Sequence, residues 1–200
     1  MSLKKPIVAA FDFDGTITTK DTFLPFLVSV FGATKVGLAL ASLALPGIKV
    51  GLGWASRDDF KALLIRKLFT GASVKTLEAA GVAHTRLMLP LCRREALSRI
   101  KWHQQRGHRV VLVSASLSFY LAPMAQLLGI NYLLCTEAEV VDGVCTGEMR
   151  GANCRAAEKV KRLESLLGPL GQYEIYAYGD SEGDAEMLTA ATYPAFMPFR

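Results

Sequence analysis

A short apolar run near the start of the chain constrains its fold most. Residues 7–11 read Ile-Val-Ala-Ala-Phe and are followed at once by Asp12-Phe-Asp14-Gly15-Thr16. An uninterrupted apolar run of this length is typical of a central strand in a parallel sheet, buried on both faces. Open α/β sheets build their sites at the carboxyl ends of the strands, which is where these acids follow. An ordinary strand that ends in an acidic turn has the same pattern, so the rest of the chain must decide.

The spacing of the two acids already indicates that they bind a cation. Asp12 and Asp14 are separated by one residue at a predicted strand end, where two unneutralised carboxylates repel each other. A divalent cation with oxygen ligands relieves that repulsion. The segment therefore favours a hard metal ion such as Mg²⁺.

Strand and helix patterns alternate along the rest of the chain. Further strands are predicted at residues 109–113, 129–135, 174–178 and 193–199, with helical segments between them. Residues 20–89 are helical throughout, which interrupts the alternation. We predict an α/β fold in which a doubly wound parallel sheet forms the core (residues 1–19 and 90–200). A helical cap (residues 20–89) is inserted after the first strand and lies over the carboxyl edge as a lid.

A second, smaller feature is expected within the core. Residues 140–146 read Val-Val-Asp-Gly-Val-Cys-Thr, and an Asp-Gly pair between β-formers favours a two-residue hairpin turn. We predict a small β-hairpin flap centred on Asp142 and Gly143.

The first part of the predicted cap is unusually apolar. Between Thr22 and Ser56 the only charged residues are Lys35 and Lys49, and Pro46-Gly47 breaks the sequence. No uninterrupted apolar run reaches the ~18 residues that suggest a membrane span. Two or three short helices are expected. They form either a well-buried bundle or an apolar surface that contacts lipid or a lipid-like substrate.

Composition excludes some functions and leaves others open. The chain is 51% hydrophobic with a formal net charge of +5, but it has no run of five or more basic residues. Scattered solvated charge is therefore favoured over nucleic-acid binding, while an anionic substrate or membrane surface also fits. The four cysteines contain no C-x-x-C pair, which favours free thiols and a cytoplasmic protein. Asp12 and Asp14 interrupt any secretory apolar segment, so no signal peptide is expected.

Polar groups follow three of the predicted strands. Asp12 and Asp14 follow the first, Ser114 the second, and Asp180 with Asp184 the fourth. In a parallel sheet these ends share one edge, which Lys159 can reach from the start of its helix. Carboxylates, a lysine and a hydroxyl suit a magnesium-assisted phosphate site. With no catalytic His or Cys evident, a carboxylate is the expected nucleophile, and its neighbour two residues on carries the proton. Taken singly, Ser114 fits a strand-end hydroxyl and Lys159 a solvated lysine.

These segments resemble the four motifs of the haloacid dehalogenase superfamily, in order and spacing, over nearly the whole chain. The resemblance implies that Asp12 is the nucleophile and Asp14 the general acid/base. It also implies which residues bind the substrate phosphate and which bind Mg²⁺. The phosphate would be held by Ser114, Ala115, Lys159, Gly15 and Thr16, and Mg²⁺ by Asp12, Asp14 through its carbonyl, Asp180 and Asp184.

The helical insertion resembles the cap of the phosphoserine phosphatase-like branch. By that resemblance Asp21 would bind a substrate amino group, and Arg66 or Lys67 a substrate carboxylate. Two departures bear on the substrate. The second motif reads Ser114-Ala115-Ser116 where phosphoserine phosphatases have Ser-Gly-Gly, and the cap is more apolar than a small zwitterion requires. In this respect the chain looks similar to phosphatidylglycerophosphatases of the C type.

Three hypotheses remain open at this point. The first is a phosphatase acting on phosphoserine or another small phosphorylated metabolite, with a lipid phosphate as its alternative. The second is a non-catalytic module that binds a phosphorylated ligand, against which the intact pair Asp12 and Asp14 argues. The third is a membrane-surface adaptor that makes peripheral contact through the apolar cap.

Overall fold

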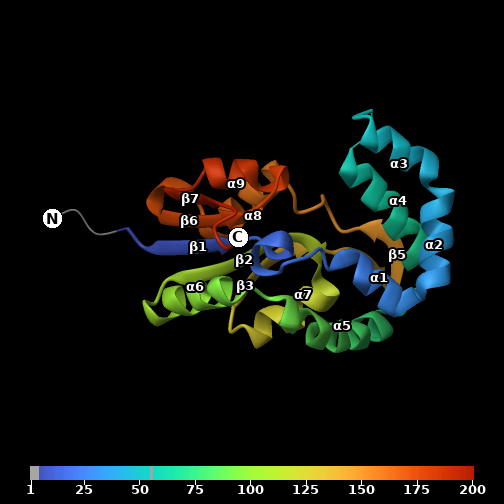
Figure 1. Ribbon diagram of the computed structural model, residues 1–200, viewed down its shortest axis with the longest axis horizontal. Coiled ribbons are helices and arrows are strands. Elements are labelled where there is room, and N and C mark those ends of the chain that lie inside the picture. Colours follow the sequence, from blue (N-terminus) through green and yellow to red (C-terminus); the bar gives the residue numbers. More distant parts are fainter. Residues whose placement is uncertain (1–4, 55) are drawn as a thin grey trace.

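The computed structural model describes residues 5–54 and 56–200. A five-stranded parallel sheet with strand order β3-β2-β1-β6-β7 lies at its centre (Figure 1). The strands are β1 (Ile7–Phe11), β2 (Arg109–Leu117), β3 (Tyr132–Thr136), β6 (Glu174–Gly179) and β7 (Tyr193–Phe196). The predicted α/β class is confirmed. Residues 1–4 and 55, which the predicted core and cap segments include, lie outside the described residues.

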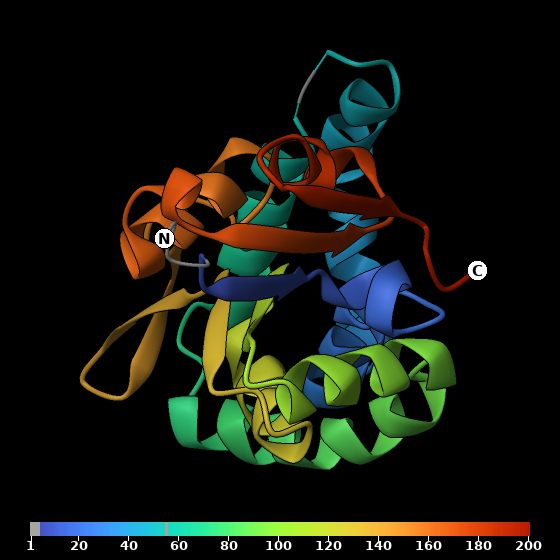
Figure 2. The same cartoon turned by 90° about the vertical axis from the view of Figure 1, so that its left-hand side faces the viewer.

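Helices cover both faces of this sheet (Figure 2). Side chains alternate along β1, so Val8 and Ala10 pack in one apolar cluster with α8 (Ala157–Leu167) and α9 (Ala185–Thr189). Ala9 and Phe11 pack on the other face with α6 (Arg94–Gln105) and α7 (Ser118–Leu127). All four of these β1 residues are fully buried. The first strand is therefore the centre of two cores, as its unbroken apolar sequence predicts.

The described part of residues 20–89, which the sequence predicts to be a helical cap, contains five helices. They are α1 (Phe23–Phe31), α2 (Ala33–Ser42), α3 (Ala44–Gly51), α4 (Arg57–Phe69) and α5 (Val74–Met88). In Figure 1, α1 to α4 lie beyond the carboxyl ends of the strands, at the end of the molecule opposite the N-terminus. The structure thus contains three short helices before α4, where the sequence predicts two or three.

The first three helices differ in how much they bury. Phe26 and Leu27 of α1 are buried, as are Val36 and Ala39 of α2, whereas α3 has no buried residue. The region therefore has an exposed apolar surface and is not a well-buried bundle. Within residues 5–54 and 56–200, no single helix has the length and hydropathy to cross a membrane; α1 and α2 meet these criteria only as a pair, bent by 118°.

The predicted flap is present as an antiparallel hairpin of β4 (Ala138–Val141) and β5 (Val144–Met149). Its turn residues Asp142 and Gly143 both have positive φ, 51° and 77°, as a primed two-residue turn requires. The hairpin also contacts the helical insertion, because the N–H of Gly71 donates to the carbonyl of Cys145 at 3.0 Å. The flap thereby joins the core to the end of α4.

Candidate active site

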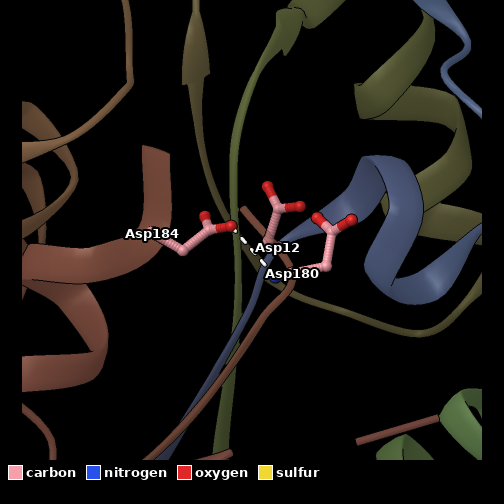
Figure 3. Close-up of side chains that lie close together, drawn as sticks. All are labelled: Asp12, Asp180 and Asp184. Atoms are coloured by element: carbon pink, nitrogen blue, oxygen red, sulfur yellow. Dashed lines mark hydrogen bonds between the residues drawn. The ribbon is translucent and has the colours of Figure 1, made fainter. Parts of the chain in front are cut away.

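Three carboxylates converge at the carboxyl edge of the sheet. Asp12 follows β1, Asp180 follows the adjacent strand β6, and Asp184 ends the short turn Glu182–Asp184. One oxygen of each lies within 4.8 Å of the others. Figure 3 shows the three side chains close together, as they emerge from these two strands and the turn. The pairing of β1 with β6 thus brings Asp12 and Asp180 close together, although they are far apart in the sequence.

Lys159 supplies the positive charge that holds two of these acids together. It lies in the first turn of α8, is 2% exposed, and its Nζ donates to Asp12 Oδ1 and Asp184 Oδ1 at 2.6 Å each. A third bond goes to the carbonyl of Val113 at 2.9 Å. Burial by itself would lower the pKa of Lys159, but the two carboxylates raise it above its ordinary value. The ammonium therefore stays charged at neutral pH.

The acids of this cluster differ in protonation. Burial raises the pKa of Asp12 to about 7, although Lys159 opposes that effect. Burial acts the same way on Asp184, but Lys159 and the backbone N–H groups of Asp180 and Ser181 lower its pKa below the ordinary value. Asp184 is therefore the fixed anion of the group, and Asp12 is the carboxylate whose charge depends most on what binds beside it.

Asp14 is held in the turn that follows β1 (Phe13–Ile17). Its Oδ1 accepts hydrogen bonds from the backbone N–H and the hydroxyl of Thr22, at 2.7 and 2.6 Å. Its Oδ2 accepts a bond of 2.5 Å from the hydroxyl of Ser116. Burial raises the pKa of Asp14 to about 6, against the lowering effect of Ser116 and Thr22. A carboxyl that titrates near neutrality can both give and take a proton.

Gly15 allows this turn to pass close to Asp180. Its φ is +79°, and a Cβ there would lie 2.2 Å from Asp180 Oδ2. Both the left-handed backbone and the close approach require glycine. The next residue, Thr16, is buried and does not line the pocket described below.

A pocket of about 460 Å³ opens over these groups. Asp12, Asp14, Lys159, Asp180 and Asp184 line it, together with Gly15, Ser114 and Ala115. Strand β2 was expected to end at Val113 but continues to Leu117, and its register with β3 shifts between Ser114 and Leu117. The Ser114 hydroxyl accepts a bond from the N–H of Ser116 at 3.1 Å. The second motif therefore lies on an irregular strand end that lines the pocket.

Helix α4 contributes a second, half-buried lysine to the pocket. Lys61 of α4 donates to the carbonyl of Ala115 and, at 2.7 Å, to Asn153 Oδ1. Asn153 in turn donates to Asp58 Oδ1 at 2.7 Å. Burial lowers the pKa of Lys61 to about 8, and Asp58 limits this shift. The three side chains join α4 to the core directly beside the second motif.

The expected cap residues Arg66 and Lys67 do not reach the pocket, which is a correction to the sequence reading. Arg66 instead pairs with Glu148 of the hairpin at 2.7 Å, and Lys67 is exposed. Five residues turn a helix by about 140°, so Arg66 cannot share the face of Lys61. The α4 residues that line the pocket are Arg57, Asp58 and Lys61.

Asp21, the other expected substrate residue, does line the pocket. In this structure its carboxylate accepts bonds from the backbone N–H groups of Phe23 and Leu24 at 3.0 and 3.4 Å, at the start of α1.

Several pocket residues were not predicted. They are Lys20, Arg57, Asp58, Lys61, Asn153, Arg155 and Arg200 in the lining, and Thr22 and Ser116 on Asp14. Ser116 lies within the second motif, so its hydroxyl could have been considered from the sequence. Asn153 and Arg200 have no such signal, and Arg200 contacts Asp180 at 2.6 Å only because the chain returns past β7.

The donor set at the sheet edge fits a hard divalent cation. Asp12, Asp180 and Asp184 offer carboxylate oxygens close enough to share one ion, and such ions prefer oxygen ligands. Lys159 occupies one oxygen of Asp12 and one of Asp184, and Arg200 occupies one of Asp180. The second oxygens of Asp12 and Asp180 are left for the ion. The arrangement can hold a cation, a phosphoryl group and a titratable carboxyl within one pocket.

Comparison with known proteins gives consistent matches in sequence. A profile of haloacid dehalogenase-like hydrolases matches residues 9–189. Protein CicA of Caulobacter vibrioides is 34% identical over 204 aligned positions, which cover 98% of this chain and 88% of CicA. A phosphoserine phosphatase of Mycobacterium tuberculosis is 26% identical, over 90% of this chain and 41% of that longer protein.

Solved structures share the fold. A protein of unknown function from Bordetella pertussis superposes with a TM-score of 0.82 at 26% identity, over 94% of this chain and 88% of that one. A phosphoserine phosphatase, solved as a phospho-aspartyl intermediate analogue, superposes with a TM-score of 0.62 at 20% identity, over 94% and 84%. This second likeness concerns the fold alone.

Proposed function

Because the chain belongs to the haloacid dehalogenase-like hydrolase family, we propose that it is a Mg²⁺-dependent phosphatase that forms an aspartyl-phosphate on Asp12. The observation that carries this proposal is the convergence of Asp12, Asp14 and Lys159 with Asp180 around one pocket. Neither a simple binding module nor a surface adaptor requires a titratable carboxyl held by three hydrogen bonds, as Asp14 is.

The proposed reaction has two steps. In the first, a carboxylate oxygen of Asp12 bonds to phosphorus while the ester P–O bond breaks, and Asp14 gives its proton to the leaving oxygen. In the second, Asp14 takes a proton from water, whose oxygen attacks phosphorus and releases Asp12 and inorganic phosphate. A pKa of about 6 for Asp14 suits both transfers. Asp12, Asp180, Asp184 and the carbonyl of Asp14 would hold Mg²⁺, which when bound neutralises phosphoryl oxygens.

Binding of the phosphoryl group is assigned to residues around Asp12. Lys159 and the Ser114 hydroxyl would contact its oxygens, aided by backbone groups of Gly15 and Ala115. Lys159 is already aimed at Asp12 and carries its charge at neutral pH. A phosphoryl oxygen would therefore replace or share contacts that this ammonium now makes with the carboxylates.

We further propose that residues 20–89 act as a cap on a core of residues 1–19 and 90–200. The contact of Lys61 with Ala115 and Asn153 supports this role, because it ties α4 to the second motif. Closure of such a cap would exclude water from the pocket while the phosphoryl group is transferred.

A small phosphorylated metabolite is the proposed substrate, with phosphoserine the first candidate. The relatives named phosphoserine phosphatases support this choice, and Asp21 is available for an amino group. Arg57 and Lys61 replace Arg66 or Lys67 as the cations that could meet a carboxylate. A lipid phosphate is the second candidate, favoured by the exposed apolar side chains of α3. Free thiols at all four cysteines support a reducing, cytoplasmic location.

The test measures hydrolysis of p-nitrophenyl phosphate, phosphoserine and phosphatidic acid with and without Mg²⁺. We expect Mg²⁺-dependent turnover that Asp12→Asn abolishes, whereas Asp59→Asn, at an exposed acid of α4, leaves it unchanged. Rapid acid quenching followed by mass spectrometry should find phosphate on the peptide that contains Asp12. Binding of phosphate without turnover of any of these esters would leave only the non-catalytic module.

A further inference from the structure

Helix α3 has two opposite faces, and only one of them packs against the protein. Leu43, Pro46, Gly47 and Val50, spaced three or four residues apart, are partly buried, and a Cβ on Gly47 would lie 3.4 Å from the ring of Phe60 in α4. The other face carries exposed residues at the same helical spacing, namely Leu45, Ile48, Lys49 and Leu52. The apolar residues of this outer face have no partner within the described chain.

The exposure of this outer face is large and continues beyond the helix. Leu45 is 74% exposed, Ile48 58% and Leu52 57%. Trp54 follows at 78%, and Leu38 of α2 is 68% exposed. In Figure 1 these two helices lie at the end of the molecule, away from the sheet and its flanking helices. Several large apolar side chains exposed on neighbouring helices are typical of an interaction site.

Residues 22–57, which include this surface, carry charges of one sign only. No acid occurs between Asp21 and Asp58, whereas Lys35, Lys49 and Arg57 are exposed. Asp58, where the acid-free stretch ends, bonds to Asn153 at 2.7 Å in the pocket. Apolar side chains, an exposed tryptophan and lysines on short helices are the composition of segments that lie in the interface of an anionic bilayer.

We propose that the outer face of α3 (Leu45, Ile48 and Leu52), with Leu38 and Trp54, docks on the surface of a bilayer that contains anionic lipid. Lys35 and Lys49 would meet the head groups while the apolar side chains enter the interface. A second copy of the same face fits less well, because a twofold contact would bring together two patches whose own charged residues are all lysines. The proposal is independent of the phosphatase reaction.

The experiment compares sedimentation with vesicles of phosphatidylcholine alone and of an equimolar mixture with phosphatidylglycerol. We expect binding to the mixed vesicles only, weakened by salt. Leu45→Glu should reduce it at least tenfold and Lys49→Glu roughly fivefold or more. Leu87→Glu is the matched control, because Leu87 is 63% exposed on α5 and lies outside this face.

Thermal melting of each variant separates loss of binding from loss of folding. Trp54 provides a second readout: its emission should shift to the blue on mixed vesicles, and Trp54→Leu should remove that change. Equal loss of binding in Leu45→Glu and Leu87→Glu would overturn the proposal, as would a wild-type protein that stays in the supernatant with both vesicles. A dimer that Leu45→Glu dissociates would assign the face to a second copy instead.

Discussion

The hydroxyl of Ser116 donates a 2.5 Å hydrogen bond to Asp14 and lowers the pKa of that carboxyl. Removing it in Ser116→Ala leaves the two bonds from Thr22. Because the lost bond stabilises the ionised form, the pKa of Asp14 should rise above its present value of about 6. We expect the limb of the pH–rate profile that reports Asp14 to move to higher pH, and kcat to fall about tenfold.

Steady-state kinetics on p-nitrophenyl phosphate across pH would measure both effects. Ser165→Ala is the matched control, since that exposed hydroxyl donates only to the carbonyl of Lys161 at 2.8 Å. A tenfold loss of kcat with no movement of either limb would show that Ser116 acts on something other than the protonation of Asp14.

Among the elements, α4 determines which cation of the insertion enters the pocket. Lys61 is held there by Ala115 and Asn153, while its burial lowers the pKa to about 8, so its charge costs stability rather than adding to it. We therefore expect Lys61→Met to raise KM for phosphate esters about tenfold, because α4 loses its contact with the second motif. The melting temperature should change little.

The control for that prediction is Lys67→Met on the same helix. Lys67 is exposed and lies outside the pocket lining, so both KM and the melting temperature should stay at the wild-type values. If Lys61→Met lowered the melting temperature by many degrees and left KM unchanged, Lys61 would be a purely structural contact.

At the scale of helices and strands, the sequence predicts well those features that local patterns determine. The run at residues 7–11 and the Asp142-Gly143 turn determine their own backbone, and parallel pairing then brings Asp180 beside Asp12. The rotation of α4 about its axis has no such local signal. It follows from contacts with Asn153, which is 92 residues from Lys61 in the chain, so Arg66 was an equally good expectation from sequence.

The exposure of α3 was likewise undetermined by its sequence. Leucines, isoleucine and valine lie on both sides of this helix, and only the contact with Phe60 decides which side is covered. A pattern that is apolar all round is compatible with a core helix and with a surface that binds a partner. The sequence therefore left a buried bundle and a lipid-contacting surface as alternatives.

At the scale of the whole molecule, the sheet and α6 enclose a buried histidine that does not line the proposed active-site pocket. His103 is fully buried; its Nε2 lies 2.9 Å from the Tyr178 hydroxyl and its Nδ1 lies 2.8 Å from Nδ1 of His108. Burial lowers the pKa of His103 to about 4, and the positive charges of His108, Arg99 and Arg106 add to the effect. The folded protein therefore holds this ring neutral at pH values where the unfolded chain protonates it.

That difference makes global stability depend on pH in a defined direction. Between the unfolded pKa of about 6.5 and the folded value of about 4, the unfolded state binds more protons, so stability falls as pH falls. From pH 7 to pH 5 we expect His103 to account for a loss of about 2 kcal/mol in the free energy of unfolding. His103→Phe removes this titration and keeps an aromatic ring beside Phe11. Between pH 7 and pH 5 its free energy of unfolding should therefore fall by about 2 kcal/mol less than that of the wild type.

Urea unfolding of the wild type and of His103→Phe at pH 7 and pH 5 measures this difference in the free energy of unfolding. The comparison isolates His103 because Asp12 and Asp14, whose raised pKa values act in the opposite sense, are present in both proteins. The variant will be less stable at pH 7, since Tyr178 and His108 lose a partner, and that offset cancels when each protein is compared with itself. If the wild type and His103→Phe lost the same stability between pH 7 and pH 5, the folded protein would admit a proton at His103 without cost. The sheet and α6 would then be less tightly packed around this ring than its burial implies.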